Sequence, residues 1–181
     1  MIKKEILIGI FILLLVAGTG WLWLSPQGLS TAPDVTFKII DGRQISMEKL
    51  RGKPVLVTFW ATDCPGCIKE MPHLITLYNE FSQKGLEIIG VAMSYDPPNQ
   101  VIELTKNRQV PYPISLDVDG SIARAFDDVM LTPTSFLIGP DGTVLKRKIG
   151  EMDMESLKSQ ITSLLSRAQI TNSSKSLVAN N

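Results

Sequence analysis

Short apolar runs alternate along the chain with longer segments whose apolar residues recur every three or four positions. The run Pro54–Trp60 (PVLVTFW) is rich in β-branched and aromatic residues, which predicts a strand buried on both faces. Leu86–Ser94 (LEIIGVAMS) has the same character. Between them, residues from Pro65 to about Lys84 have apolar side chains at helical spacing, and Gly85 suits a helix end. This order predicts a β-α-β unit with parallel strands.

The same pattern predicts further strands and helices on both sides of this unit. The first of these is a β-hairpin. It is predicted because Asp41-Gly42 supplies the backbone conformations that a tight turn needs. The predicted segments are the hairpin strands Val35–Ile40 and Arg43–Ser46, the helices Pro98–Asn107, Ser121–Phe126 and Asp153–Arg167, and the strands Tyr112–Leu116, Thr134–Ile138 and Thr143–Ile149. Together they indicate an α/β domain with a mostly parallel central sheet, an antiparallel edge and helices on both faces.

The N-terminal segment is different in kind. Ile6–Leu24 contains nineteen residues without a charge, and a helix of that length spans roughly 28 Å, close to the hydrocarbon core of a bilayer. Lys3 and Lys4 precede it, and Trp21 and Trp23 lie at its far end. Because positive charges favour the cytoplasmic side, we expect an uncleaved single-pass anchor with the rest of the chain outside the cytoplasm.

The composition of the remaining segments divides the chain into four parts. We expect an anchor at residues 1–24, a linker at 25–32, a domain at 33–168 and a polar, disordered tail at 169–181. A cleaved signal peptide is the alternative for the first segment. The 18 basic residues balance 18 acidic ones, which argues against nucleic acid as a partner, since phosphate binding needs a basic surface.

Cys64 and Cys67 are the only cysteines, and they follow the first buried strand in the stretch WATDCPGC. Cys64 falls near the expected N-cap of the next helix, where free N–H groups and the helix dipole favour a thiolate. Cys67 comes one turn later and can reach it, and Pro65 suits the first helical position. This arrangement predicts a redox pair in which Cys64 attacks a partner and Cys67 resolves the mixed disulfide.

Other interpretations of the pair remain open at this point. With His73, the only histidine, the cysteines could contribute to a zinc or copper site, or they could form a structural disulfide. Glu70 lies one turn beyond Cys67 and could shuttle protons if burial raised its pKa. Spacing alone favours a solvated helix residue for Glu70. We expect no metal and no cofactor.

Three separated motifs, VLVTFWATDCPGC, IKEMP and TPTSFLIGPDGTVL, resemble those of the thioredoxin superfamily, in particular the membrane-anchored TlpA/ResA-like thiol–disulfide oxidoreductases. The likeness covers about residues 33–167. It implies a thioredoxin-like α/β fold whose central mixed sheet is flanked by helices, with an N-terminal β-hairpin, an inserted α/β element and one preceding transmembrane helix.

The resemblance also implies roles for single residues. Cys64 would be the exposed nucleophile and Cys67 the buried resolving cysteine. Pro133 would be cis beside the disulfide, and the backbone of Thr132 would pair with a bound partner chain. Glu70 matches the acidic residue of the family's C-x-x-E-x-P pattern, which favours a functional role.

Four residues around the cysteines are expected to tune the redox potential: Trp60, Asp63, Pro65 and Gly66. Asp63 stands where the family usually has tryptophan, and its charge should raise the pKa of the Cys64 thiol. Thr58 stands where thioredoxin has a buried aspartate. These departures from the family pattern leave the direction of electron flow open.

We therefore expect an extracytoplasmic reductase of disulfides in exported proteins, supplied with electrons by a membrane thiol reductant at the cytoplasmic membrane. Apocytochrome c is a substrate that the family suggests. The alternatives are a disulfide-donating oxidase, a peroxidase, and a membrane-tethered module that binds a metal or partner without turnover.

Overall fold

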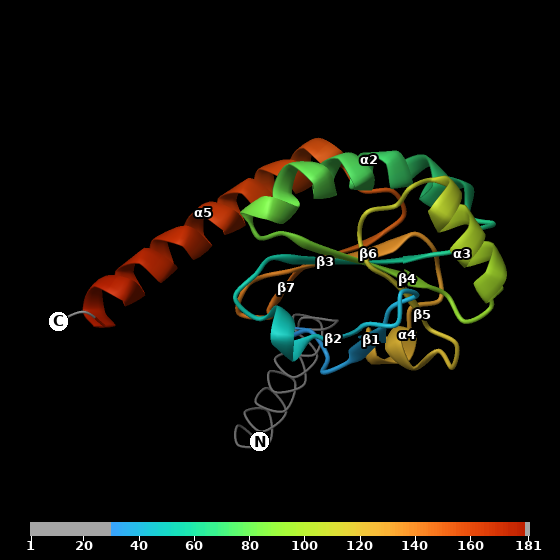
Figure 1. Ribbon diagram of the computed structural model, residues 1–181, viewed down its shortest axis with the longest axis horizontal. Coiled ribbons are helices and arrows are strands. Elements are labelled where there is room, and N and C mark those ends of the chain that lie inside the picture. The colour runs from blue at the N-terminus through green and yellow to red at the C-terminus, as the bar shows by residue number, and fades with distance from the viewer. Residues whose placement is uncertain (1–29, 180–181) are drawn as a thin grey trace, which may run out of the picture.

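The computed structural model describes residues 30–179, which form a layered α/β domain (Figure 1). The expected membrane anchor and most of the expected linker lie outside these residues. Within residues 30–179, no helix combines the length and the hydrophobicity that crossing a membrane requires.

The central sheet has five strands in the order β5-β4-β3-β6-β7. The strands are β3 (Val55–Trp60), β4 (Glu87–Ala92), β5 (Ile114–Leu116), β6 (Thr134–Ile138) and β7 (Val144–Ile149). β3, β4 and β5 are mutually parallel, whereas β6 and β7 form the antiparallel edge. The predicted mixed sheet is thus confirmed. The N-terminal hairpin, β1 (Thr36–Lys38) and β2 (Gln44–Ser46), is a separate antiparallel pair.

The helices cover both faces of this sheet. They are α2 (Pro65–Phe81), α3 (Pro98–Asn107), α4 (Ser121–Ala125) and α5 (Met154–Ala179), with short 3₁₀ helices η1 (Glu48–Leu50) and η2 (Ser82–Lys84). η2 continues α2 and ends at Gly85, whose φ of 111° is the left-handed conformation expected of a terminating glycine.

The last helix is longer than its apolar pattern predicts. We expected it to end at Arg167 and a disordered tail to follow, but α5 continues to Ala179. Residues 168–179 contain no proline or glycine. Extending an established helix by one residue requires far less entropy than starting one, so a polar segment without helix breakers can prolong it.

Strand β3 lies at the centre of the molecule, and all six of its residues are buried. Leu56 and Trp60 face α2 and α5, whereas Val57 and Phe59 face the hairpin and α4. Figure 1 shows these layers above and below the sheet. The two-sided burial explains the continuous apolar run and fixes the position at which the chain leaves β3 toward α2.

The chain enters the domain at the far end of the sheet from that position. Ala32 N donates to Gly142 O at 2.9 Å, and Val144 N donates to Ser30 O at 3.0 Å, so residues 30–32 lie beside the β6–β7 turn. Val55 pairs with Ile138, next to this turn. β3 therefore begins where the N-terminal segment enters and ends at the opposite edge, where the cysteines follow.

Candidate active site

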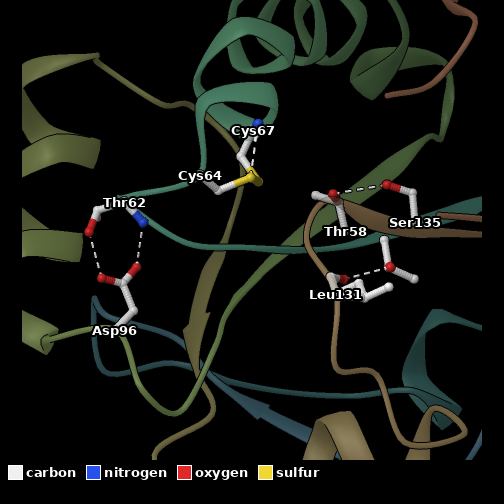
Figure 2. The surroundings of a disulfide bond; sticks show 8 residues. Thr58, Thr62, Cys64, Cys67, Asp96, Leu131 and Ser135 are labelled. Carbon is white, nitrogen blue, oxygen red and sulfur yellow. Dashed lines mark hydrogen bonds between the residues drawn. A yellow bond between two sulfur atoms is a disulfide. The ribbon is translucent and has the colours of Figure 1, made fainter. Parts of the chain in front are cut away.

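Cys64 and Cys67 form a disulfide at the start of α2 (Figure 2). Their sulfur atoms are 2.12 Å apart and their Cα atoms 5.3 Å apart. Cys64 is the N-cap of α2 and Pro65 its first residue, as the sequence predicts. The first helical turn brings the two side chains together, since it places residues three positions apart on the same side.

The helix terminus treats the two sulfur atoms differently. The backbone N–H of Cys67 donates to Cys64 Sγ at 3.2 Å, so Cys64 already accepts one of the free N–H groups of the first turn. Cys64 is 8% exposed and Cys67 is 4% exposed, so in the oxidised protein Cys64 is not the exposed residue that the family resemblance implies, although it is the more accessible of the two. A thiolate is therefore better stabilised and more accessible at Cys64 than at Cys67.

Glu70 is buried, with only 4% of its surface exposed. The interpretation as a solvated helix residue, which spacing alone favoured, is wrong because the loop after β7 covers this side chain. Glu70 Oε1 accepts a hydrogen bond from Met152 N at 2.7 Å. Burial raises the pKa of Glu70, and the Met152 hydrogen bond opposes that rise. A carboxyl with a raised pKa can hold and release a proton beside Cys67.

A cavity of about 10 Å³ lies against Cys67, which is about the space of one water molecule. Its lining consists of Thr58, Trp60, Cys67, Glu70, Met71, Leu74, Tyr112 and Pro133. Burial and the charge of Glu70 both raise the pKa of Tyr112, which keeps that phenol neutral. The cavity therefore brings the resolving cysteine, a buried carboxyl and a buried hydroxyl around one small space.

The Thr132–Pro133 peptide bond is cis, as the family resemblance implies. A Cβ added to Gly66 would lie 3.4 Å from Pro133 Cδ, so this proline packs beside the dipeptide between the cysteines. Met130 and Leu131 precede it and are 80% and 61% exposed. An apolar, accessible loop thus borders the disulfide.

The four predicted tuning residues all lie at the site, but in different environments. Trp60 is buried at the end of β3, and its indole N–H has no partner in the part of the chain that the structure describes. Asp63 and Pro65 are exposed, and Gly66 is partly buried. Of these four residues, only Trp60 lines the small cavity beside Cys67.

Asp96 makes a contact at the site that the sequence does not predict. Its carboxylate accepts hydrogen bonds from Thr62 N at 2.7 Å and from Thr62 Oγ1 at 2.6 Å, as Figure 2 shows. Asp96 is buried in the loop after β4, and Thr62 lies two residues before Cys64. The pair anchors the loop that carries the first cysteine.

Two other contacts at the site also escaped prediction. Ser135 Oγ donates to Thr58 Oγ1 at 2.9 Å, and Met152 supplies the N–H that binds Glu70. A polar Thr58 within an otherwise apolar strand was the available signal for the first contact. No local pattern marks the second contact, because it joins residues 82 positions apart.

The family model described as Redoxin matches residues 28–165. A thiol-disulfide oxidoreductase ResA of Bacillus thuringiensis subsp. konkukian (strain 97-27) is 32% identical over 167 residues, covering 86% of this chain and 94% of that protein.

Solved structures agree with this relationship and with a thioredoxin-like fold. StoA from Bacillus subtilis is 30% identical, with a TM-score of 0.62 over 72% of this chain and 97% of its own. A thiol:disulfide interchange protein of the thioredoxin family from Chlorobium tepidum TLS is 25% identical, with a TM-score of 0.69 over 78% and 99% of the two chains.

Proposed function

Because the chain belongs to the Redoxin family and is a thiol–disulfide oxidoreductase, we propose that it reduces disulfide bonds in exported proteins. Apocytochrome c, before haem attachment, is the substrate class that the resemblance to the TlpA/ResA-like family suggests. The observation that carries the proposal is the position of Cys64 at the N-terminus of α2, where its sulfur accepts the Cys67 N–H.

The first step starts from the reduced pair. The Cys64 thiolate attacks one sulfur of the partner's disulfide, forms a mixed disulfide and releases the partner's other sulfur as a thiolate, which takes up a proton. The exposed residues Met130 and Leu131 precede Pro133, which packs beside Gly66, and they offer apolar contacts to the partner chain. The backbone of Thr132 provides hydrogen-bonding groups for an extended partner segment.

The second step uses Cys67. Its thiol loses a proton to the nearby Glu70 carboxylate, and the resulting thiolate attacks Cys64 Sγ. The bond between Cys64 and the partner breaks, and the partner leaves as a second thiolate that is protonated. The partner's disulfide has gained two electrons, and the enzyme has become the Cys64–Cys67 disulfide. A dithiol donor in the membrane must return two electrons before the next cycle.

We place this reaction on the outer side of the cytoplasmic membrane. The uncharged stretch Ile6–Leu24 after Lys3 and Lys4 supports a single anchor with this orientation. Residues 30–32 join the domain beside the β6–β7 turn, at the sheet end opposite the disulfide. A domain tethered there would present Cys64 away from its point of attachment, toward soluble partners.

The experiment that tests the proposed direction is a redox titration of full-length protein, purified in a mild detergent and equilibrated with thiol buffers. A midpoint potential below roughly −200 mV, toward the thioredoxin value of about −270 mV, supports a reductase. A potential near about −120 mV identifies a disulfide donor instead. The absence of a reversible two-electron transition would overturn exchange altogether.

A separate experiment tests the location. Protease added to intact spheroplasts should digest the thioredoxin-like domain. Protection of the domain until the membrane is dissolved would place it in the cytoplasm and overturn that part of the proposal.

A further inference from the structure

The hydroxyl groups of Thr58 and Ser135 form a buried pair near the disulfide (Figure 2). The two residues are direct partners in the antiparallel ladder of β3 and β6, and Ser135 Oγ donates to Thr58 Oγ1 at 2.9 Å. A hydroxyl has one hydrogen to donate and two lone pairs to accept with. Ser135 occupies one lone pair of Thr58, and no residue that the structure describes accepts the Thr58 hydrogen.

Thr58 also lines the cavity of about 10 Å³ that borders Cys67. The titratable groups facing this space, besides the cysteine, are Glu70 from α2 and Tyr112 from the segment before β5. Glu70 Oε1 already accepts the Met152 N–H. The Thr58 hydrogen is therefore a free donor within a space that fits at most one water molecule.

Reduction changes what surrounds this donor. The two sulfur atoms, which are bonded to each other in the oxidised form, must separate once that bond is broken. Cys67 is the less exposed of the two cysteines, and it lines the small cavity, whereas Cys64 does not. We propose that the Thr58 hydroxyl donates its own hydrogen to the Cys67 sulfur of the reduced enzyme, directly or through the one water that the cavity can hold, whether or not Ser135 donates to its oxygen.

This contact stabilises the reduced form relative to the oxidised form. A hydrogen bond to an ionised acceptor stabilises that charged form, and a couple whose reduced form is stabilised is more oxidising. Thr58 thus determines how readily the pair accepts electrons, a role that rests on the thiol–disulfide exchange proposed above. The reaction itself is unchanged, since Thr58 neither gains nor loses a covalent bond.

Three substitutions separate this role from a purely structural one. Thr58→Val has nearly the same shape and removes both the free donor and the hydrogen bond with Ser135. Ser135→Ala removes the same hydrogen bond but keeps the Thr58 hydroxyl, so it is the matched control. Thr58→Ser restores the hydroxyl. A structural role would destabilise the oxidised and reduced forms equally and would leave the midpoint potential unchanged.

The test is a redox titration of each full-length variant between about pH 6 and about pH 10, a range that includes the ordinary pKa of a thiol. Thr58→Val should lower the equilibrium constant for reduction about tenfold where Cys67 is ionised, which corresponds to ~30 mV toward more negative potential. The pH at which Cys67 ionises should also rise. Thr58→Ser and Ser135→Ala should stay near the wild-type potential.

The outcomes are distinct from those of the proposed function. If Thr58→Val does not fold, the double variant Thr58→Val/Ser135→Ala leaves no unpaired hydroxyl and should show the same fall. Wild-type potentials in the valine variants, or an equal shift in Ser135→Ala, would overturn the inference while exchange stands. A wild-type protein without a reversible couple would instead overturn the proposed function.

Discussion

Glu70 and Met152 are 82 residues apart in the sequence and are joined by a hydrogen bond of 2.7 Å from the Met152 N–H to Glu70 Oε1. The contact ties the second turn of α2 to the loop between β7 and α5. An exposed ion pair, Lys69 with Glu151, lies alongside it and adds little because water screens it. The buried contact is thus the one that fixes the carboxyl beside Cys67.

The raised pKa of Glu70 predicts how stability depends on pH. A carboxyl with a higher pKa in the folded than in the unfolded state binds its proton more tightly when folded. Its contribution is fully present below the ordinary value of 4.5 and is lost as the pH rises through the raised value. The free energy of unfolding of the wild type should therefore fall over this range relative to that of Glu70→Gln.

Glu70→Gln is a suitable reference because the glutamine oxygen can still accept the Met152 N–H. Urea unfolding of both oxidised proteins at a series of pH values measures the difference. Parallel curves for the two proteins above pH 4.5 would show that Glu70 has an ordinary pKa in the folded state.

The difference between the two cysteines predicts which variant captures a partner. Cys67→Ser retains the sulfur at the N-cap of α2 but has no resolving thiol, so mixed disulfides through Cys64 should accumulate. Cys64→Ser should form few mixed disulfides or none. The sulfur that remains, that of Cys67, is less exposed and does not accept the helix N–H that Cys64 Sγ accepts. Non-reducing electrophoresis of extracts from cells expressing each variant measures the adducts. More adducts with Cys64→Ser would reverse the assigned roles.

Much of the fold could be predicted because local patterns determine it. β3 is apolar throughout since both faces are covered, and α2 begins at Cys64 because Pro65 and the free N–H groups suit a helix start. The length of α5 escaped prediction. Its final residues continue an established helix, whereas the apolar pattern in the sequence ends before them.

The site was predictable only where neighbouring residues suffice. The spacing of Cys64 and Cys67 is local, and the Thr132–Pro133 geometry came from a family likeness. The burial of Glu70 depends on a loop that is distant in sequence, and the Asp96 contact joins residues 34 positions apart. A sequence pattern does not contain such distances.

The Asp96 contact predicts a stability difference between two substitutions. Asp96→Ala leaves Thr62 N–H and Oγ1 without their buried acceptor and should cost about 2–3 kcal/mol. Asp96→Asn keeps the shape and can still accept the Thr62 N–H, so it should cost less than about half of that. Urea unfolding of the oxidised proteins checks both values. Equal losses would show that the charge, rather than the contact geometry, stabilises this loop.

Gly90 on β4 packs against Trp60 and Tyr112, two of the residues that line the small cavity beside Cys67. A Cβ at this position would lie 2.7 Å from Ile114 Cδ1, 3.2 Å from Trp60 Nε1 and 3.3 Å from Tyr112 Cε2. Gly90→Ala should therefore destabilise the fold by about 1–3 kcal/mol, because these side chains are closely packed. Thermal or urea unfolding measures the loss.

A second substitution identifies which neighbour is responsible. Ile114→Val removes the Cδ1 methyl that lies nearest to the added Cβ, and on its own it should cost about 0.5–1.5 kcal/mol. In the double variant the two losses should not add, since the valine leaves room for the alanine methyl. Strictly additive losses would mean that Trp60 and Tyr112, rather than Ile114, limit the space at Gly90. In that case Gly90→Ala should also displace Trp60, which lines the cavity beside Cys67, and the redox potential should change together with the stability.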